Sequence, residues 1–386
     1  MAGAGPPLPL LPASAQSVSE LPARSCGASV RAGYAARVQV RPCLKDYSVE
    51  ALRERLGSEG WRPYRAEQIA HWLYARGVES SDAMTDLSRE DRERLDAEWE
   101  LHALRIERVD RSRDGTIKAV LRGVDSARIE SVLIPEDRRT TLCLSTQVGC
   151  GMACSFCATG AMGFTRNLGT AEIVDQFCRM RSLLSADRQI TNVVFMGMGE
   201  PLLNRAAVEE AIRIFLHPKA FALAPRRVTV STVGVVPQIA PLLENVPVNL
   251  AVSLHASSDA VRERLVPLNR SYPLDALLGS LRDCPRVTRR RPVFFEYTLI
   301  DGVNDGLEDA RRLPGLLKGI PCKLNLIPMN PHPAVPYRPP PPERIERFLG
   351  ELVAGGLTVT LRRSRGPDIA AACGQLALSA AGSKAP

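Results

Sequence analysis

Apolar residues recur with two different spacings along this chain of 386 residues. From residue 45 to about 102 the spacing is helical, because apolar side chains return every three or four positions. Two such faces are formed by Val49, Leu52 and Leu56, then by Ile69, Trp72 and Leu73. Ser88 precedes a third helical stretch and is placed to cap its first turn. The pattern predicts a small helical domain over 45–103.

Strand-like patterns follow this region. Three short runs over 104–135, separated by glycine-containing turns, predict a short β linker region. Apolar runs of strand length then recur at 141–145, 190–196, 227–231, 248–254, 293–300 and 322–327. Helical patterns alternate with them at 171–184, 206–216, 236–243, 258–265, 274–282 and 307–318, and a helix at 343–354 and a strand at 357–361 close the series.

This alternation of strand and helix predicts a parallel sheet with right-handed crossovers. A closed barrel of this type needs eight units, and the sequence offers six. We therefore expect an α/β fold, a partial (open) six-unit βα barrel with the small helical domain at its N-terminus. The barrel core is expected over 136–365, followed by a C-terminal tail over 366–386. In such barrels the chemistry lies on the loops after the carboxyl ends of the strands.

The first 44 residues differ from the rest of the chain. They are rich in proline, small residues and arginine, with Glu20 as the only acidic residue. We expect residues 1–44 to form a disordered leader, since they carry too little apolar surface for a core. An organellar transit peptide is a weaker alternative, because the early prolines oppose an amphipathic helix.

Composition excludes several classes of protein. With 45% apolar and 24% charged residues, the chain is able to bury a sizeable core. No window approaches the ~18 apolar residues of a membrane-spanning helix, which excludes an integral membrane protein. The net charge of +8 favours an anionic partner such as nucleic acid. Charge that serves solubility alone explains that number equally well.

The spacing of the ten cysteines is more informative than their number. Cys150, Cys154 and Cys157 fall within eight residues, on the loop after the first barrel strand, whereas the others lie far apart. A compact cluster in a long chain indicates metal binding in a reducing compartment. A structural zinc site takes four ligands and a 4Fe–4S cluster usually four cysteines, so three cysteines would leave one iron open. A zinc site completed by a distant residue and unligated buried thiols are the alternatives.

The Cys-x3-Cys-x2-Cys spacing, with the aromatic Phe156 before its last cysteine, resembles the signature of radical S-adenosylmethionine enzymes. Gly199-Glu200-Pro201, after the second barrel strand, resembles the element that holds the methionyl amino group in that superfamily. The resemblance implies a 4Fe–4S cluster on Cys150, Cys154 and Cys157, with S-adenosylmethionine bound to its fourth iron.

Further motifs narrow the resemblance to one subfamily. They include the stretch from Ile134 to Cys150, Ser231-Thr-Val-Gly, Ser253-Leu-His, Asn330-Pro and Ala372-Cys-Gly-Gln-Leu. Over about residues 60–378 the chain resembles the radical-SAM RNA methyltransferases. These enzymes methylate C2 of adenosine in 23S rRNA, at the peptidyl-transferase centre, and in tRNA, on the 3′ side of the anticodon. The positions that match the family's S-adenosylmethionine contacts are Gly199, Glu200, Ser231, Ser253, Leu254, His255 and Asn330.

C2 is an electrophilic carbon, so it cannot attack a methyl cation donor. The resemblance implies another route by which C2 receives its methyl group. One S-adenosylmethionine methylates Cys373, and a second supplies the radical that takes hydrogen from this S-methyl group. The carbon then adds to C2 and ties the base to the protein. Glu130 matches the family's proton acceptor, and Cys143 matches the cysteine that resolves the link through a transient Cys143–Cys373 disulfide. Without the family, Glu130 would be taken as an exposed strand residue and both cysteines as buried structural thiols.

Partners and location follow from the same resemblance. Two arginine runs, at 286–291 and 362–365, are candidates for contacts to the phosphates of 23S rRNA or tRNA, and residues 45–103 are expected to assist RNA binding. The chemistry needs an external reductant such as flavodoxin or ferredoxin and a thiol reductant. We expect a cytoplasmic monomer with no membrane partner.

Three other functions remain open from the sequence alone. A C8-methylating relative shares every motif named above. A glycyl-radical activase or maturation enzyme would use the same cluster but would not need Cys143 and Cys373. A zinc-bearing RNA-binding module would perform no catalysis.

Overall fold

The computed structural model describes residues 41–378. Most of the predicted leader, with Cys26, and the last eight residues of the tail lie outside the described residues, and their predictions stay untested. No helix in the described part of the chain has the length and apolar character that crossing a membrane requires.

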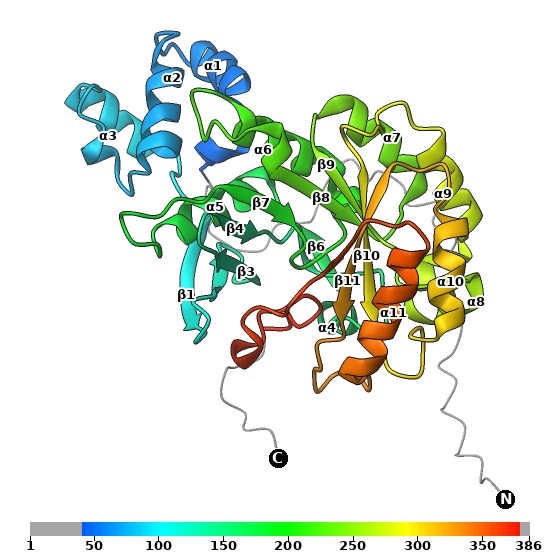
Figure 1. The fold of residues 1–386 in the computed structure, drawn as a ribbon. Helices are drawn as coiled ribbons and strands as arrows, with labels where there is room; N and C mark the ends of the chain where they lie inside the picture. Colours follow the sequence, from blue (N-terminus) through cyan, green and yellow to red (C-terminus); the bar gives the residue numbers. More distant parts are fainter. Residues whose placement is uncertain (1–40, 379–386) are drawn as a thin grey trace, which may run out of the picture. The chain divides into compact units, whose positions relative to one another are not determined.

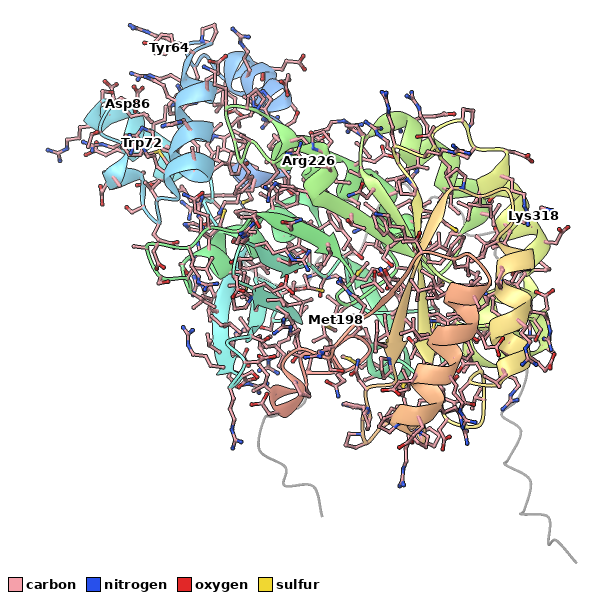
Figure 2. All side chains as sticks on the ribbon, viewed as in Figure 1. Tyr64, Trp72, Asp86, Met198, Arg226 and Lys318 are labelled. Atoms are coloured by element: carbon pink, nitrogen blue, oxygen red, sulfur yellow. The ribbon has the colours of Figure 1, made fainter. Side chains whose placement is uncertain are left out.

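Short helices build the N-terminal region, at the upper left of Figure 1. They are α1 (Val49–Ser58), α2 (Arg65–Ala70), which continues as a π-helix over His71–Arg76, and α3 (Arg89–Glu98). The predicted cap is confirmed, because the Ser88 hydroxyl accepts the N–H of Asp91 at 3.1 Å. Trp72 is only partly buried, and its indole N–H donates to Asp86 beside it (Figure 2).

The predicted apolar face of α1 is buried as expected, with Val49, Leu52 and Leu56 at most 5% exposed. A buried ion pair lies where this region meets the sheet domain. The Lys45 ammonium contacts the carboxylate of Asp175 on α5 (Thr170–Arg181), and both side chains are fully buried. The other oxygen of Asp175 accepts the N–H groups of Ala103 and Leu104, both at 2.9 Å. Burial alone would raise the pKa of Asp175, but the neighbouring cations, Lys45 first, hold it well below its ordinary value.

This ion pair predicts a specific loss of stability in acid. A carboxyl whose pKa is lowered in the folded state contributes stability above about pH 4, and that contribution disappears as the pH falls toward the lowered pKa. An Asp175→Asn variant leaves Lys45 charged and buried, so the free energy of unfolding at pH 7 should fall by about 3 kcal/mol. Urea unfolding at pH 7 and below pH 4 should show a shallower acid decline than in wild type. The exposed control Asp283→Asn should change neither, and an unaltered acid decline in Asp175→Asn would contradict the assignment.

One ten-stranded sheet carries the rest of the fold, in the order β1-β2-β3-β4-β7-β8-β9-β10-β11-β12. Its first four strands, β1 to β4, pair antiparallel with one another, and all neighbours from the β4–β7 pair onward are parallel. The strands are β1 Leu104–Arg111, β2 Ile117–Gly123, β3 Arg128–Pro135, β4 Thr140–Cys143, β7 Asn192–Phe195, β8 Val228–Thr232, β9 Asn249–Ser253, β10 Val293–Leu299, β11 Cys322–Pro328 and β12 Val359–Leu361.

A helix follows most of the parallel strands, as predicted. Besides α5 these are α6 Arg205–Leu216, α7 Val236–Asn245, α8 Asp259–Leu265, α9 Leu274–Arg282, α10 Leu307–Leu316 and α11 Pro342–Ala354. Figure 1 shows α10 and α11 side by side next to β10 and β11. Because β1 and β12 are both edges, the sheet does not close. The predicted fold class, an open parallel α/β barrel with an N-terminal helical region, is confirmed.

Two features of the fold are absent from the sequence prediction. The hairpins of β1–β3 are continuous with the main sheet, because β3 pairs with β4 and brings Val132 opposite Cys143. A separate small sheet joins β5 (Gln147–Gly149) to β6 (Phe164–Asn167) around the cysteine loop, with the short helix α4 (Ala158–Ala161) between them. Both features place backbone next to the predicted chemistry.

Candidate active site

One pocket collects most of the predicted site residues at the carboxyl ends of the parallel strands. These residues reach it from the loops after β4 and β7, from β8 and β9 with the loop that follows β9, and from the C-terminal tail. Those that line it are Cys150, Cys154, Cys157, Gly199, Glu200, Ser231, Ser253, His255 and Cys373. The structure therefore brings together nine positions that are up to 223 residues apart in the sequence.

Glycines hold the cysteine loop in a tight conformation. Gly149 has φ +74°, and a Cβ at this position would lie 1.9 Å from the carbonyl oxygen of Gly163, so a larger residue does not fit. The Cys150 N–H donates to the same carbonyl at 2.8 Å. A Cβ on Gly160 would lie 3.1 Å from the backbone of Cys154. These close approaches direct the loop and its cysteines toward the pocket.

The three thiols have the ligand chemistry that an iron–sulfur cluster requires. Cys154 is buried and the other two are half-buried, all on the pocket wall. Burial raises the pKa of Cys150 to about 12 and raises that of Cys154, and the nearby thiols add to both shifts. Within residues 41–378 no three cysteine, histidine or acidic side chains are already arranged as a metal site. The thiols thus fit the cluster by type and lie on one pocket wall, and metal binding would have to bring them together and displace their protons.

Gly199 and Glu200 line the same pocket as the cysteines, from the loop after β7. Gly199 has φ +104°, and a Cβ would lie 2.6 Å from the side chain of Gln147, so close backbone approach requires glycine here. Gln147 in turn accepts the Glu200 N–H at 2.9 Å. The small sheet that carries Gln147 therefore sets the position of Glu200.

Glu200 is a buried carboxylate with backbone partners. Its oxygens accept the N–H groups of Leu202 at 3.0 Å and Val233 at 2.9 Å. Burial raises the pKa of Glu200 to about 7, although these hydrogen bonds oppose the shift. Such a group gains from a cationic ligand, because an ammonium in the pocket would favour its ionised form.

His255 is neutral and fixed in one tautomer. Its Nδ1 accepts the Thr298 N–H at 2.9 Å, which leaves the proton on Nε2. Burial lowers the pKa of His255 to about 3. The ring of Phe156 packs edge-on against it, with centroids 4.6 Å apart. The imidazole and the hydroxyl groups of Ser231 and Ser253 are available to a polar ligand in the pocket.

Leu254 and Asn330 are not among the lining residues. The Leu254 N–H donates to the Glu296 carbonyl at 2.9 Å, and its own carbonyl accepts from Arg262 at 3.1 Å. The Asn330 amide donates to the carbonyl of Cys373 at 3.1 Å and accepts the Ser364 hydroxyl. In this structure Asn330 therefore holds the tail, and the main chain of Leu254 is fully hydrogen-bonded.

The tail brings Cys373 into the pocket and toward Cys143. Cys373 is exposed to the pocket interior, and the surrounding protein raises the pKa of its thiol. Cys143, on β4, is buried and its pKa is raised, first by burial and then by the nearby Cys373 thiol. Both cysteines are in the free thiol form. The Cys373 thiol is thus close enough to Cys143 to affect its pKa.

Glu130 corrects one expectation. Taken without the family it would be an exposed residue of a half-buried strand, but its side chain is completely buried. It faces Lys118 at 3.0 Å, and its Oε2 accepts the N–H of Ala377 at 2.9 Å. The alternation of residues along β2 and β3 would leave this face of the strands exposed to solvent, but the tail covers it. A local sequence pattern cannot predict a contact with so distant a segment.

Sequence analysis missed Arg262 on α8. The residue is 1% exposed, and its guanidinium donates to the carbonyls of Val233, Ser253 and Leu254 and to the Asn269 side chain. It therefore ties the ends of β8 and β9 together beside the pocket. It is also close enough to Cys154 for its charge to oppose the rise in that thiol's pKa. No motif signals it, because a lone arginine on a helix is usually solvated.

Replacing Arg262 should cost more stability than any surface charge. An Arg262→Met variant keeps most of the volume but removes the donor from four acceptors, two of them in buried contacts and two in part-buried ones. Each buried acceptor left without a donor costs about 1–3 kcal/mol. We expect a loss of at least about 3 kcal/mol in the free energy of unfolding of the cluster-free protein, measured by urea denaturation. Arg264→Met, an exposed change on the same helix, is the control. A loss below about 1 kcal/mol would contradict the bridging role.

Glu296 is the second residue that sequence analysis missed. It lines the pocket from β10, and its Oε1 accepts the amide of Asn325 at 2.8 Å. Burial raises the pKa of Glu296. Its strand neighbours are apolar, so the sequence pattern alone would place it inside the sheet without a function.

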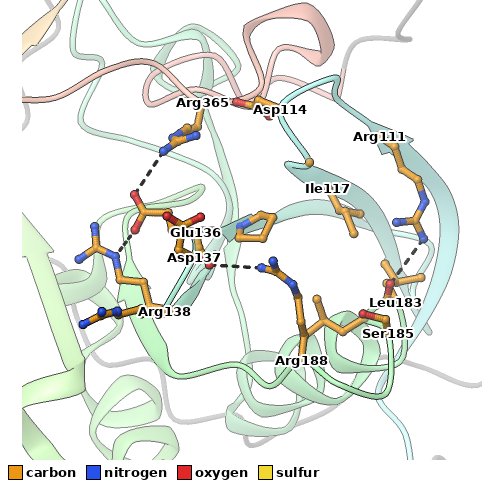
Figure 3. Close-up of a pocket in the computed structure, with 14 residues that line it drawn as sticks. Arg111, Asp114, Ile117, Glu136, Asp137, Arg138, Leu183, Ser185, Arg188 and Arg365 are labelled. Atoms are coloured by element: carbon orange, nitrogen blue, oxygen red, sulfur yellow. Dashed lines mark hydrogen bonds and ion pairs between the residues drawn. The ribbon is translucent and has the colours of Figure 1, made fainter.

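A second, open cavity is rich in arginine (Figure 3). Arg365 forms an ion pair with the Glu136 carboxylate, with Nη2 and Oε1 3.4 Å apart, and Arg188 donates to the main-chain carbonyl of Glu136 at 3.2 Å. The other arginines on its wall are Arg111, Arg138 and Arg139. This surface lies next to the segment that leads into the tail. The arginines of the other predicted run, at 286–291, are all exposed.

The open parallel sheet, the three cysteines after its first parallel strand and the Gly-Glu pair after the next define a radical-SAM enzyme. Comparison with known families agrees. Residues 144–313 match the radical SAM superfamily, and residues 43–101 match the ribosomal RNA large subunit methyltransferase N-terminal domain.

Individual relatives narrow the assignment. The dual-specificity RNA methyltransferase RlmN of Syntrophobacter fumaroxidans is 46% identical over 86% of this chain and 97% of its own length. That of Geobacter sulfurreducens is 48% identical over 86% of this chain and 91% of its own. A radical SAM methyltransferase from Sphaerobacter thermophilus superposes with a TM-score of 0.84 at 47% identity, over 87% of this chain and 99% of that structure. The chain belongs to the radical-SAM dual-specificity RNA methyltransferase family.

Proposed function

We propose that this enzyme methylates C2 of adenosine in 23S rRNA and in tRNA and that Cys373 carries the methyl group. The observation that supports this most is the docking of the tail, which presents Cys373 to the pocket that holds the cysteine loop and Glu200. A methyl group on the Cys373 sulfur would face the same space as the cofactor. An activase or a zinc-bearing module would have no use for this arrangement.

Cys150, Cys154 and Cys157 would hold a 4Fe–4S cluster, and Glu200 would accept the methionyl ammonium of S-adenosylmethionine. When bound, cluster and S-adenosylmethionine together supply a 5′-deoxyadenosyl radical. Ser231, Ser253 and His255 would orient the nucleoside part through their hydroxyl and imidazole N–H groups. Leu254 and Asn330 would lie beside this site. Asn330 would act through its hydrogen bond to the Cys373 carbonyl.

Cys373 and Cys143 would share the sulfur chemistry. Once the methyl carbon has lost one hydrogen and joined C2, the base is bound to the Cys373 sulfur. Glu130 would accept the C2 proton, since a carboxylate near the base is the group that such a step needs. The unpaired electron left on the base would pass to a one-electron acceptor, for which the oxidised cluster is the candidate. The Cys143 thiolate would then attack the Cys373 sulfur. This forms the S–S bond, breaks the S–CH2 bond and leaves the electron pair on the carbon, which takes up a proton.

RNA would approach across the arginine surfaces. Arg362 is close enough to Cys373 for its charge to oppose the rise in that thiol's pKa, so the second arginine run would lead toward the methyl carrier. The adenosine must leave its stack to expose C2, and arginine contacts to phosphates would hold the flanking backbone. Flavodoxin or ferredoxin and a thiol reductant would supply electrons to a cytoplasmic monomer.

Nucleoside analysis tests the proposed reaction. The reconstituted enzyme, given S-adenosylmethionine, reductant and 23S rRNA or tRNA, should yield 2-methyladenosine in digests separated by mass spectrometry. 8-Methyladenosine would assign the chain to the C8 reaction instead, and unmodified adenosine in both RNAs would reject the proposal.

A further inference from the structure

A buried pair of opposite charges lies beneath the tail. Lys118 on β2 and Glu130 on β3 occupy diagonal positions of the antiparallel pair, because Val120 lies directly opposite Glu130. Their charged atoms are 3.0 Å apart, and their side chains are 1% and 0% exposed. Burial of an ammonium costs free energy that only well-placed partners offset. The proposed reaction gives Lys118 no role, so its burial at this place needs another explanation.

The pair contacts the tail on both sides of Cys373. The Lys118 ammonium donates to the carbonyl of Ala370 at 3.3 Å, three residues before the cysteine. The Glu130 Oε2 accepts the N–H groups of Ala377 at 2.9 Å and Leu378 at 3.2 Å, four and five residues after it. The two charges therefore act as a clamp on a nine-residue loop with the methyl carrier near its middle.

Backbone contacts between these ends complete the docking. The Gly374 carbonyl accepts the Ala158 N–H at 2.8 Å, and the Leu376 carbonyl accepts the Thr159 hydroxyl at 2.6 Å. Both partners lie on the helix that follows the cysteine loop. The clamp thus holds the tail against the loop that carries the predicted cluster ligands, which is the arrangement needed to methylate Cys373.

The docked tail also limits what Glu130 can do. Its Oε2 is occupied by two backbone N–H groups, and its Oε1, which faces Lys118, is buried without a hydrogen bond. Glu130 is not among the pocket residues. In this conformation the carboxylate binds the tail and cannot reach a base, so methylation of Cys373 and proton transfer from C2 belong to different positions of the tail.

We propose that Lys118 is a positioning residue: paired with Glu130, it clamps the tail so that Cys373 receives its methyl group before RNA binds. This inference rests on the proposed function. Lys118 acts through Glu130 and the Ala370 carbonyl and touches no substrate. Removing its charge should free the tail and slow the loading of Cys373.

Hydrogen exchange tests the clamp without any cofactor. In the cluster-free protein, exchange of the 370–378 peptide should accelerate at least about tenfold in Lys118→Met, because the amides that Glu130 protects open more often. Lys118→Arg, which keeps the charge and a donor, should restore most of the protection. The control Arg122→Met removes an exposed charge from the same strand and should leave exchange unchanged. Exchange in Lys118→Met at the wild-type rate overturns the inference.

If Lys118→Met does not fold, Lys118→Arg provides the test. This variant must still load Cys373 at a rate within about threefold of wild type, and failure to do so overturns the inference as well.

Loading of Cys373 gives the second readout. Intact-protein mass spectrometry after incubation with labelled S-adenosylmethionine, in the absence of RNA, should show a rate lower by about tenfold to a hundredfold in Lys118→Met. An equal rate in variant and wild type overturns the inference and leaves the proposed function intact. Absence of the label from wild-type Cys373 would instead reject the proposed function.

Discussion

A Cys373→Ala variant is expected to lose RNA methylation by at least about a thousandfold, because it removes the sulfur proposed to carry the methyl carbon to C2. The substitution removes only a sulfur atom that faces the pocket interior. Folding and cluster incorporation should therefore be unchanged. Product formation is measured as 2-methyladenosine per enzyme over many turnovers.

The control for this variant is Cys322→Ala. Cys322 belongs to no family motif and begins β11, and burial raises the pKa of its thiol to about 11. Its removal should leave turnover within about twofold of wild type, as expected for a site outside the chemistry. Full activity of Cys373→Ala would show that the methyl group reaches RNA by another route.

A Cys143→Ala variant is expected to stop at a covalent protein–RNA adduct. Cys373 can still accept the methyl group and its carbon can still join C2, but Cys157, the other thiol close to Cys373, would be held by the cluster and could not attack the Cys373 sulfur. Nearly all turnover should be lost, by about a thousandfold or more. The adduct should appear as a species that survives denaturing electrophoresis and disappears after nuclease digestion.

The double variant Cys143→Ala/Cys373→Ala separates the roles of the two thiols. It should form no adduct, because the attachment point is absent. An adduct in the double variant would move the attachment to another residue. Free, methylated RNA released by Cys143→Ala at the wild-type rate would show that resolution does not need Cys143.

Local patterns in the sequence predict most of the scaffold. Helical spacing identifies α1 because its apolar side chains pack on one side, and Ser88 is recognised because an N-cap depends on neighbouring residues alone. The parallel strands are found because each is a short apolar run between helices. The cysteine loop and Gly199-Glu200 follow from their place after two of these strands.

Features that depend on distant contacts escape such patterns. Glu130 is buried because a tail 247 residues away folds over it. Asn330 turns toward the Cys373 carbonyl for the same reason. Arg262 is buried because main-chain carbonyls at the ends of two strands accept its N–H groups, and burial of a charge with several partners leaves no periodic trace in the sequence. The site depends on the position of the tail, and local sequence patterns do not predict that position.

The most direct test of the central claim follows one carbon atom. Cys373 is first loaded with a ¹³C-methyl group, free S-adenosylmethionine is removed, and unlabelled S-adenosylmethionine is added together with RNA and reductant. Mass spectrometry then locates the label in a single turnover. The account predicts that ¹³C leaves the Cys373 peptide and appears in 2-methyladenosine. Label that stays on the protein while unlabelled 2-methyladenosine forms would contradict it.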